Sequence, residues 1–308
     1  MDNILQTSAD IDNTHFAQAL MCKPEDSLAY IVPSNNLTIL TQNIRSIYKN
    51  LDSFQVTLHS LNFDCDVLVM TECHLSENKP IPVLSDNYNT YYTKKCINQC
   101  DGVIFYVSKT LNYAISEPNI SNASCLVLTL KDTVVIGIYR SPSIRNTDDF
   151  ISSLELQLQN YKQYENIIIT GDINIDIKLN SADPNCNNYL TTLAYHGLLP
   201  GHRLPTRDKM CYDHMMLKTS LPAKSLVLSN APTDHSTVII NLMYKPLYHN
   251  VVKTRASVDF DGASNEIKSK ITVILESQDP VQAAECLVDT ISTALHNNRK
   301  TISNVFHL

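Results

Sequence analysis

The sequence predicts an α+β fold in which two sheets pack face to face with helices outside. Short runs rich in β-branched residues recur between residues 37 and 242, separated by Asn, Asp, Ser and Pro, which is typical of strands. Helical spacing interrupts these runs in only a few places, whereas a doubly wound parallel sheet would need a helix after nearly every strand. The 308 residues, 44% of them hydrophobic, are enough to bury a full core.

Each expected element has its own local signal. Apolar residues at helical spacing predict helices over residues 51–61, 150–161 and 189–194. Asp148 and Asp149 suit the first turn of the second helix, and Gly197 can end the third. The β-branched runs predict strands at residues 37–42, 67–71, 103–107, 126–130, 134–139, 167–170, 214–217, 226–228 and 237–242.

Changes in sequence pattern divide the chain into three segments. Residues 1–36 are polar and aperiodic, so we expect a poorly ordered leader with a short helix around residues 15–21. Residues 37–243 hold all the expected strands and form the main domain. After Pro246 two amphipathic stripes follow, separated by Asp279 and Pro280, so we expect residues 244–308 to be a helical extension.

Composition excludes several classes of protein. The longest apolar runs fall far short of the ~20 residues that a membrane span needs, so no membrane association is expected. No secretory signal is visible, and the nine cysteines include no CxxC pair, which indicates an intracellular protein, nuclear or cytoplasmic, with reduced thiols. The net charge of −7 argues against strong non-specific affinity for duplex DNA but leaves DNA open as a substrate.

Polar residues gather where the expected strands end. If these strand ends converge at one edge of the sandwich, their side chains form an oxygen-rich site. Carboxylate and amide oxygens suit Mg²⁺ or Mn²⁺, and too few Cys and His lie nearby for structural zinc. The residues that would form this site are Asn43, Glu72, Asp172, Asn174 and Asp234.

Each of these residues also has an ordinary structural interpretation. Asn43 can be a turn former and Glu72 a solvated carboxylate. Asp172 and Asn174 beside a glycine can form a simple Asx turn, and Tyr139 can be packing. The ordered set, rather than any one residue, therefore carries the functional interpretation.

Six motifs occur in the order and approximate spacing of the endonuclease/exonuclease/phosphatase superfamily. They are QNIRS (42–46), TE (71–72), IYRSP (138–142), GDIN (171–174), YDH (212–214) and TDHS (233–236). With LPTR at 204–207, they resemble the apurinic-type endonuclease domain of non-LTR, jockey-like retrotransposons, and the resemblance covers residues 37–243. It implies a four-layer α/β/β/α sandwich of the DNase I type with two mixed sheets, and a helical connector like residues 250–308.

The resemblance also implies roles for the site residues. Glu72 would be the main ligand of Mg²⁺ or Mn²⁺, supported by Asn43 and Asp234, while Asp172 would deprotonate the attacking water. The residues expected to act on the phosphate are Asn174, His235 with Asp213 behind its ring, and Tyr139. The residues expected to bind substrate are Arg140, Arg145, Thr206 and Arg207.

Two positions depart from the family pattern. Repair-type relatives place a second carboxylate two residues after the first Asn, where this chain has Arg45. The glycine-rich approach to the strand at residues 103–107 is reduced to a single glycine, Gly102.

Three functions remain open at this level. The first is a DNA endonuclease that leaves a 3′-hydroxyl primer for target-primed reverse transcription, with DNA as substrate and element RNA or a reverse transcriptase as partners in a longer parent protein. The second is a phosphatase or phosphodiesterase acting on inositol phosphates, a lipid or RNA; the YRSP motif favours the nuclease. The third is a non-catalytic DNA- or protein-binding domain, against which the intact set of motifs argues.

Overall fold

The first of two large sheets has seven strands in the order β1-β12-β13-β2-β3-β5-β4. Strands β2 and β3 run parallel, as do β1 and β12, and the other neighbours are antiparallel, so the sheet is mixed. The bounds are β1 Gln18–Cys22, β2 Leu37–Asn43, β3 Val67–Thr71, β4 Tyr88–Tyr92, β5 Ile104–Ser108, β12 Ala223–Leu228 and β13 Thr237–Leu242. In the computed structural model the described residues are 17–31, 36–96, 98–144, 146–178, 183–229, 231–244, 253–275 and 279–304.

The second sheet has six strands in the order β10-β11-β9-β8-β7-β6. Its central pair, β8 and β9, is parallel, and its other pairs are antiparallel. The bounds are β6 Ala114–Ser116, β7 Ala123–Thr129, β8 Thr133–Arg140, β9 Asn166–Asp172, β10 Leu199–Pro200 and β11 Asp213–Lys218.

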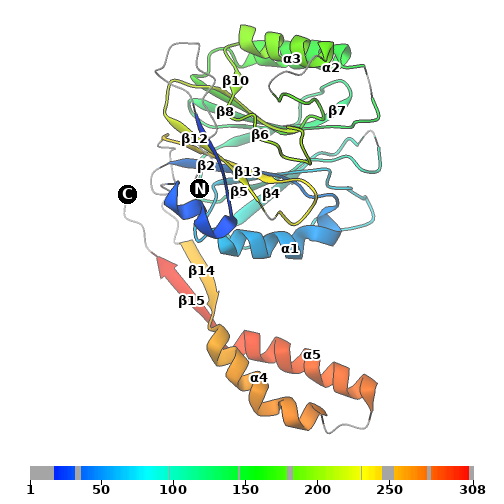
Figure 1. Ribbon diagram of the computed structural model, residues 1–308, viewed down its shortest axis with the longest axis vertical. Helices are drawn as coiled ribbons and strands as arrows, with labels where there is room; N and C mark the ends of the chain where they lie inside the picture. The colour runs from blue at the N-terminus through cyan, green and yellow to red at the C-terminus, as the bar shows by residue number, and fades with distance from the viewer. Residues whose placement is uncertain are drawn as a thin grey trace. The chain divides into compact units, whose positions relative to one another are not determined.

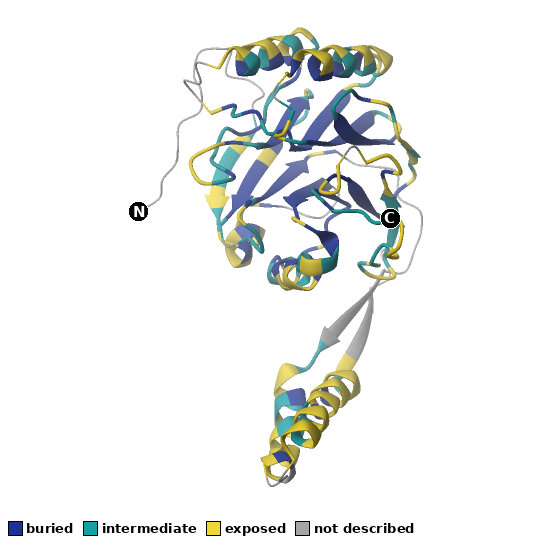
Figure 2. Cartoon of the chain, turned by 90° about the vertical axis from the view of Figure 1, so that its right-hand side faces the viewer, coloured by how far each residue is buried: buried dark blue, intermediate teal, exposed yellow. Residues whose placement is uncertain are grey.

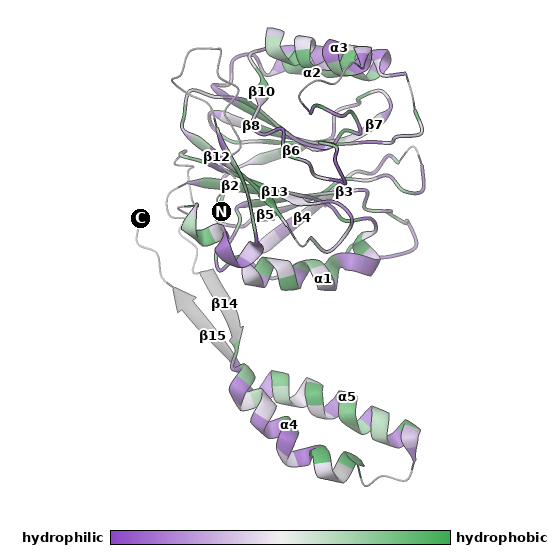
Figure 3. Ribbon diagram, viewed as in Figure 1, coloured by the Kyte–Doolittle hydropathy of each residue, from purple (hydrophilic) through white to green (hydrophobic). Residues whose placement is uncertain are grey.

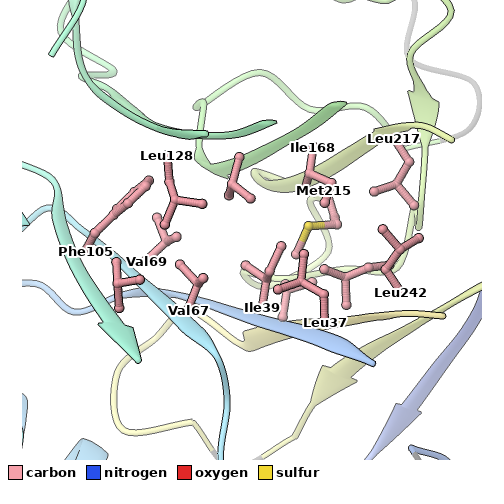
Figure 4. Close-up of a cluster of buried hydrophobic side chains, with 14 of the residues drawn as sticks. Leu37, Ile39, Val67, Val69, Phe105, Leu128, Ile168, Met215, Leu217 and Leu242 are labelled. Carbon is pink, nitrogen blue, oxygen red and sulfur yellow. The ribbon is translucent and has the colours of Figure 1, made fainter. Parts of the chain in front are cut away.

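Three apolar clusters hold the layers together. The central cluster lies between the sheets and joins side chains such as Ile39 and Phe105 of the first sheet to Leu128 and Ile168 of the second (Figure 4). Helix α1 (Ile47–Ser60) packs on the outer face of the first sheet, and α2 (Asp148–Asn160) and α3 (Pro184–Tyr195) pack on that of the second (Figure 1). The fold is therefore the expected four-layer α/β/β/α sandwich.

Burial follows the layers. The strands at the centre of both sheets are buried, whereas the outer helices keep an exposed face (Figure 2). Helix α1 accordingly alternates between hydrophobic and hydrophilic residues (Figure 3). An amphipathic helix of this kind is stabilised mainly by the face it buries on the sheet.

All nine expected strands exist, with ends shifted by a few residues at most. Three short or partly exposed strands, β4, β6 and β10, were not expected, because their side chains lack a clear alternating pattern. The helix expected around residues 15–21 is wrong in its described part: β1 pairs parallel with β12 and is followed by a 3₁₀ helix, Pro24–Ala29. Leu20 and Cys22 pack against the cluster beneath α1, so tertiary contact decides the conformation of this part of the expected leader.

The chain divides into two compact units, Met1–His249 and Asn250–Leu308. In the second unit, β14 (Lys253–Val258) pairs antiparallel with β15 (Arg299–Asn304), and this pair was not expected. The two expected helices are confirmed as α4 (Phe260–Leu275) and α5 (Pro280–Asn297). Asp279 caps α5 by accepting from the backbone N–H of Val281 and Gln282. None of the helices in the described part of the chain has the length and apolar character to cross a membrane.

Candidate active site

The strand topology brings the polar strand ends to one edge of the sandwich. Since β2 and β3 are parallel, Asn43 pairs with Thr71 at their carboxyl ends, directly before Glu72. In the second sheet Asp172 ends β9 and lies opposite Asp213, the first residue of the antiparallel strand β11. Side chains directly opposite in such a ladder share a face, so these two carboxylates become neighbours.

Asn43 links the carboxylates of the two sheets. Its side-chain nitrogen lies 2.8 Å from Oε2 of Glu72 and 2.7 Å from Oδ2 of Asp172. Both Asn43 and Asp172 are buried, and Glu72 is mostly so. A single amide therefore fixes the separation of the two carboxylates most central to the expected chemistry.

The backbone at this edge adopts uncommon conformations. Glu72 has a φ of 51° and Asn174 a φ of 53°, both in the left-handed region that non-glycine residues rarely occupy. Gly171 has a φ of 127°, and a Cβ there would lie 2.0 Å from the carbonyl oxygen of Ile138. Only glycine fits between β9 and β8 at this point, which explains the glycine that precedes Asp172.

Asp213 and His235 form a buried pair. The Nδ1 of His235 lies 2.8 Å from Oδ2 of Asp213, and both side chains are at most 1% exposed. Burial disfavours the charged ring, but the hydrogen bond and charge of Asp213, with the charges of Asp172 and Asp234, outweigh it and raise the pKa of His235. The Nε2 of His235 is also buried and has no hydrogen-bond partner among the described residues, so it is the ring nitrogen left for a further group.

The pKa of Asp172 is raised to about 7, because the carboxylate is buried and faces the charge of Asp213. The opposing influences of His235, Asn43 and Asn174 are smaller. Negative charges held together in this way disfavour ionisation, and a bound cation would relieve their repulsion.

The donors fit a hard divalent ion. Single ligand atoms of Glu72, Asp172 and His235 all lie within 4.8 Å of one another. Two of the three are carboxylates, which suits Mg²⁺ or Mn²⁺ better than zinc. Asn43 directs its side-chain N–H groups at both carboxylates, and its Oδ1 accepts from the backbone N–H of Arg45, so it positions these ligands. Asp234 does not belong to this group: its Oδ2 lies 2.8 Å from Nη1 of Arg45 and 3.1 Å from Nε of Arg207.

Asn174 and Tyr139 also lie at this edge. The Nδ2 of Asn174 donates to the carbonyl of Arg140, which uses one of its two N–H groups, and its backbone N–H donates to Oδ1 of Asp172. Tyr139 is 3% exposed, and burial together with the nearby charges of Glu72 and Asp172 raises the pKa of its phenol. The phenol therefore stays protonated and can act as a donor.

The expected substrate-binding residues differ in their exposure. Arg140 is buried and donates to the carbonyls of Ile173 and Asn174, a geometry suited to holding the loop that carries Asn174. Thr206 is also buried. Arg207 is partly exposed, and Arg145 lies outside the described residues.

Sequence reasoning missed the supporting roles of two residues, Thr206, which was expected to bind substrate, and Gln42. The hydroxyl of Thr206 accepts from the backbone N–H of Tyr212 and Asp213, so it fixes the start of β11. Gln42 donates to the hydroxyl of Thr233 and the carbonyl of His235, which fixes the loop before β13. Both residues stand inside the quoted motifs, but only tertiary contacts reveal what they hold.

Comparison of structures identifies the class to which this fold belongs. The chain is similar to the 3′ phosphatase NExo from Neisseria bound to a product DNA hairpin, with a TM-score of 0.54 and 16% identity over 67% of this chain and 99% of that one. It is similar to the endonuclease domain of TRAS1, a telomere-specific non-LTR retrotransposon, with a TM-score of 0.50 and 11% identity over 67% and 98% of the two chains. It is also similar to an endonuclease/exonuclease/phosphatase family protein from Leptotrichia buccalis, with a TM-score of 0.50 and 16% identity over 67% of this chain and 99% of that one.

The fold is thus that of endonuclease/exonuclease/phosphatase proteins, and the similar structures include a non-LTR retrotransposon endonuclease, as the motifs indicated. No protein-family model and no curated protein matches the chain by sequence.

Proposed function

We propose that the chain is a divalent-metal-dependent phosphodiesterase that nicks one strand of DNA and leaves a 3′-hydroxyl end. The observation that carries the proposal is the buried Asp213–His235 pair beside the carboxylates of Glu72 and Asp172. Glu72 would hold Mg²⁺ or Mn²⁺, and Asn43 would position its carboxylate through the N–H that it donates to Oε2. Such an ion, when bound, stabilises the negative charge that develops on the phosphoryl oxygens.

Asp172 is suited to be the general base. Burial and the charge of Asp213 raise the pKa of its carboxylate, which makes Asp172 a stronger base than an exposed aspartate. The amide of Asn43 and the backbone N–H of Asn174 fix both of its oxygens. Asp172 would therefore orient an attacking water and take its proton.

His235 and Asn174 are suited to bind the scissile phosphate. The raised pKa of His235 favours a cationic ring whose free Nε2 can donate to a phosphoryl oxygen. Asn174 has a second N–H to donate, and Tyr139 offers a protonated phenol near the leaving oxygen. Donors fixed in this way stabilise the transition state because they need no reorganisation.

DNA is the substrate favoured by the likeness to TRAS1 and to NExo, whose names refer to a retrotransposon endonuclease and a DNA hairpin product. We accordingly assign residues 37–243, with β1, to the catalytic domain and the nick to target-primed reverse transcription, with element RNA or a reverse transcriptase as partners in a longer parent protein. Residues 244–308 would then be a connector.

Supercoiled plasmid provides the test. The full chain should convert it to open circles in Mg²⁺ or Mn²⁺ but not in EDTA, and DNA polymerase should extend the nick directly. Glu72→Gln and Asp172→Asn should lower nicking by on the order of 10²-fold or more, because each removes a group that acts on the transition state. Glu155→Gln, a change on the partly exposed face of α2, is the matched control and should leave nicking unchanged.

Two results would reject the proposal. Cleavage that persists in EDTA would show that the reaction does not need a divalent metal ion. Release of phosphate from a 3′-phosphorylated oligonucleotide without plasmid nicking would assign the site to a phosphatase instead.

A further inference from the structure

Two arginines converge on one carboxylate at the rim of the candidate site. The same oxygen of Asp234, Oδ2, lies 2.8 Å from Nη1 of Arg45 and 3.1 Å from Nε of Arg207. The three side chains are 44%, 40% and 33% exposed for Arg45, Asp234 and Arg207 respectively, so the group faces solvent. We call these three residues the arginine clamp.

The backbone fixes Arg45 in this place. The N–H groups on either side of it, from Ile44 and Ser46, donate to the carbonyls of Thr71 and Glu72 at 3.0 and 2.9 Å. The side chain of Asn50 on α1 donates to the carbonyl of Arg45 at 3.1 Å. Arg45 itself has a φ of 45°, a left-handed conformation that these contacts maintain.

Arg207 is fixed independently. Its N–H donates to the carbonyl of Met210, whose N–H donates back to Arg207, closing a tight turn. The preceding residue, Thr206, accepts from the N–H of Ser236, so the turn is tied to the loop that carries Asp234. The two guanidinium groups therefore come from separate rigid segments.

The charge of the clamp is unsuited to a metal ligand. Two guanidinium groups share one carboxylate, which leaves a net charge of +1, and Nε of Arg45 also lies 3.7 Å from Oε1 of Glu72. A divalent cation that bound Asp234 would have to displace both arginines. A phosphate would instead be attracted by this positive charge. Arg207 contacts Asp234 through Nε, so the two terminal nitrogens of its guanidinium group can donate to a phosphate.

We propose that the arginine clamp binds a backbone phosphate of the DNA next to the scissile one, and that Asp234 positions the two arginines instead of binding the metal ion. Arg45 then supplies a positive charge at the point where repair-type relatives have a second carboxylate. This inference rests on the proposed function, because it needs DNA as the substrate.

DNA affinity and its salt dependence test the arginines. Fluorescence anisotropy of a labelled duplex with the full chain in EDTA gives both quantities without cleavage. Arg45→Met and Arg207→Met should each weaken binding about fivefold at low salt and reduce the slope of log K against log salt by about 0.9, the value for one lost phosphate contact. Lys162→Met is the matched control: it removes one exposed positive charge near the start of β9, away from the end that carries Asp172, and should leave the slope unchanged.

Metal affinity tests Asp234. Mn²⁺ binding to the free protein, followed by its electron paramagnetic resonance signal, should stay within about twofold of wild type in Asp234→Ala and fall at least tenfold in Glu72→Gln.

The outcomes separate the inference from the proposed function. Loss of Mn²⁺ binding in Asp234→Ala, or an unchanged salt slope in both arginine variants, would contradict the proposed role of the arginine clamp. The proposed nicking activity would be unaffected by either result. Unchanged Mn²⁺ binding in Glu72→Gln contradicts the proposed metal site itself. Melting temperatures of Arg45→Met and Arg207→Met that match wild type would show that their weaker DNA binding is not caused by unfolding.

Discussion

The chain contains the dipeptide Asp-His twice, and a different residue of each dipeptide lies in the candidate site. In Asp213-His214 the aspartate faces the candidate site and the histidine packs on the far side of the sheet. In Asp234-His235 the histidine lies in the site and the aspartate stands at the exposed rim. The site's carboxylate–imidazole pair is therefore assembled from one residue of each dipeptide.

Local conformation explains the difference. Successive side chains of a strand point to opposite faces, so Asp213 and His214, the first two residues of β11, must separate. His214 meets Tyr189 of α3, whose hydroxyl lies 3.2 Å from its Nδ1, while its Nε2 lies 2.8 Å from the carbonyl of Ile175. A buried histidine is thus charged or neutral according to its partner, not its depth.

The two rings titrate in opposite directions. Burial lowers the pKa of His214 to about 4, whereas the pKa of His235 is raised by Asp213. His214 therefore stabilises the fold above the unfolded-state pKa of about 6.5, and this contribution is lost as pH falls toward 4. His235 stabilises it below that value, and its contribution is lost as pH rises through its folded-state pKa.

The largest expected effect comes from replacing each histidine in turn. His235→Ala should lower nicking by on the order of 10²-fold at every pH, because it removes a fixed donor to the developing charge. His214→Ala should instead cost about 3 kcal/mol of stability, because it leaves a cavity and unpairs Tyr189 and the carbonyl of Ile175.

Urea unfolding and the nicking rate of the folded fraction separate the two effects. Comparable losses of catalytic rate in both variants, after correction for unfolded protein, would contradict the division of roles between the two dipeptides.

Sequence reasoning reached most of this arrangement. The positions of the strands along the chain, and the placing of Asn43, Glu72 and Asp172 at strand ends, follow from which runs are apolar and which residues end them. The order of the strands in the two sheets comes from the structure alone. The same residues could not show that Asp234 turns toward Arg45 and Arg207, since those contacts join positions 189 and 27 residues away in the chain. Likewise β1 has too few alternating residues to be distinguished from a polar leader without its partner strand.

A smaller effect is expected from Asp213→Asn, which keeps the shape of the pair but removes its charge. The pKa of His235 should fall because its main charged partner is lost, and the pKa of Asp172 should also fall because Asp213 helps to raise it. Both limbs of the pH–rate profile should therefore move to lower pH. If the pKa of His235 falls by about one unit, the loss of nicking at alkaline pH should exceed that at mildly acidic pH by about tenfold.

The nicking rate of wild type and variant over a range of pH measures this shift. The losses of nicking rate caused by Asp213→Asn and His235→Ala should also be non-additive, so that Asp213→Asn lowers the rate little further once His235 is alanine. Parallel profiles with an unchanged melting temperature would mean that Asp213 does not act through the ring.

The smallest effect is expected from removing the second unit, which contains neither dipeptide. Every residue of the candidate site, from Asn43 to His235, and every strand of the two large sheets precedes Tyr244. The division between His249 and Asn250 also separates two units that each have their own internal packing. A chain ending at Tyr244 should therefore stay folded and nick plasmid within about twofold of the full-length rate, since the first unit has its own internal packing. Circular dichroism and the plasmid assay check this directly. A truncated chain that is folded yet inactive would show that the helical unit shapes the site, and the two dipeptides would then no longer account for it alone.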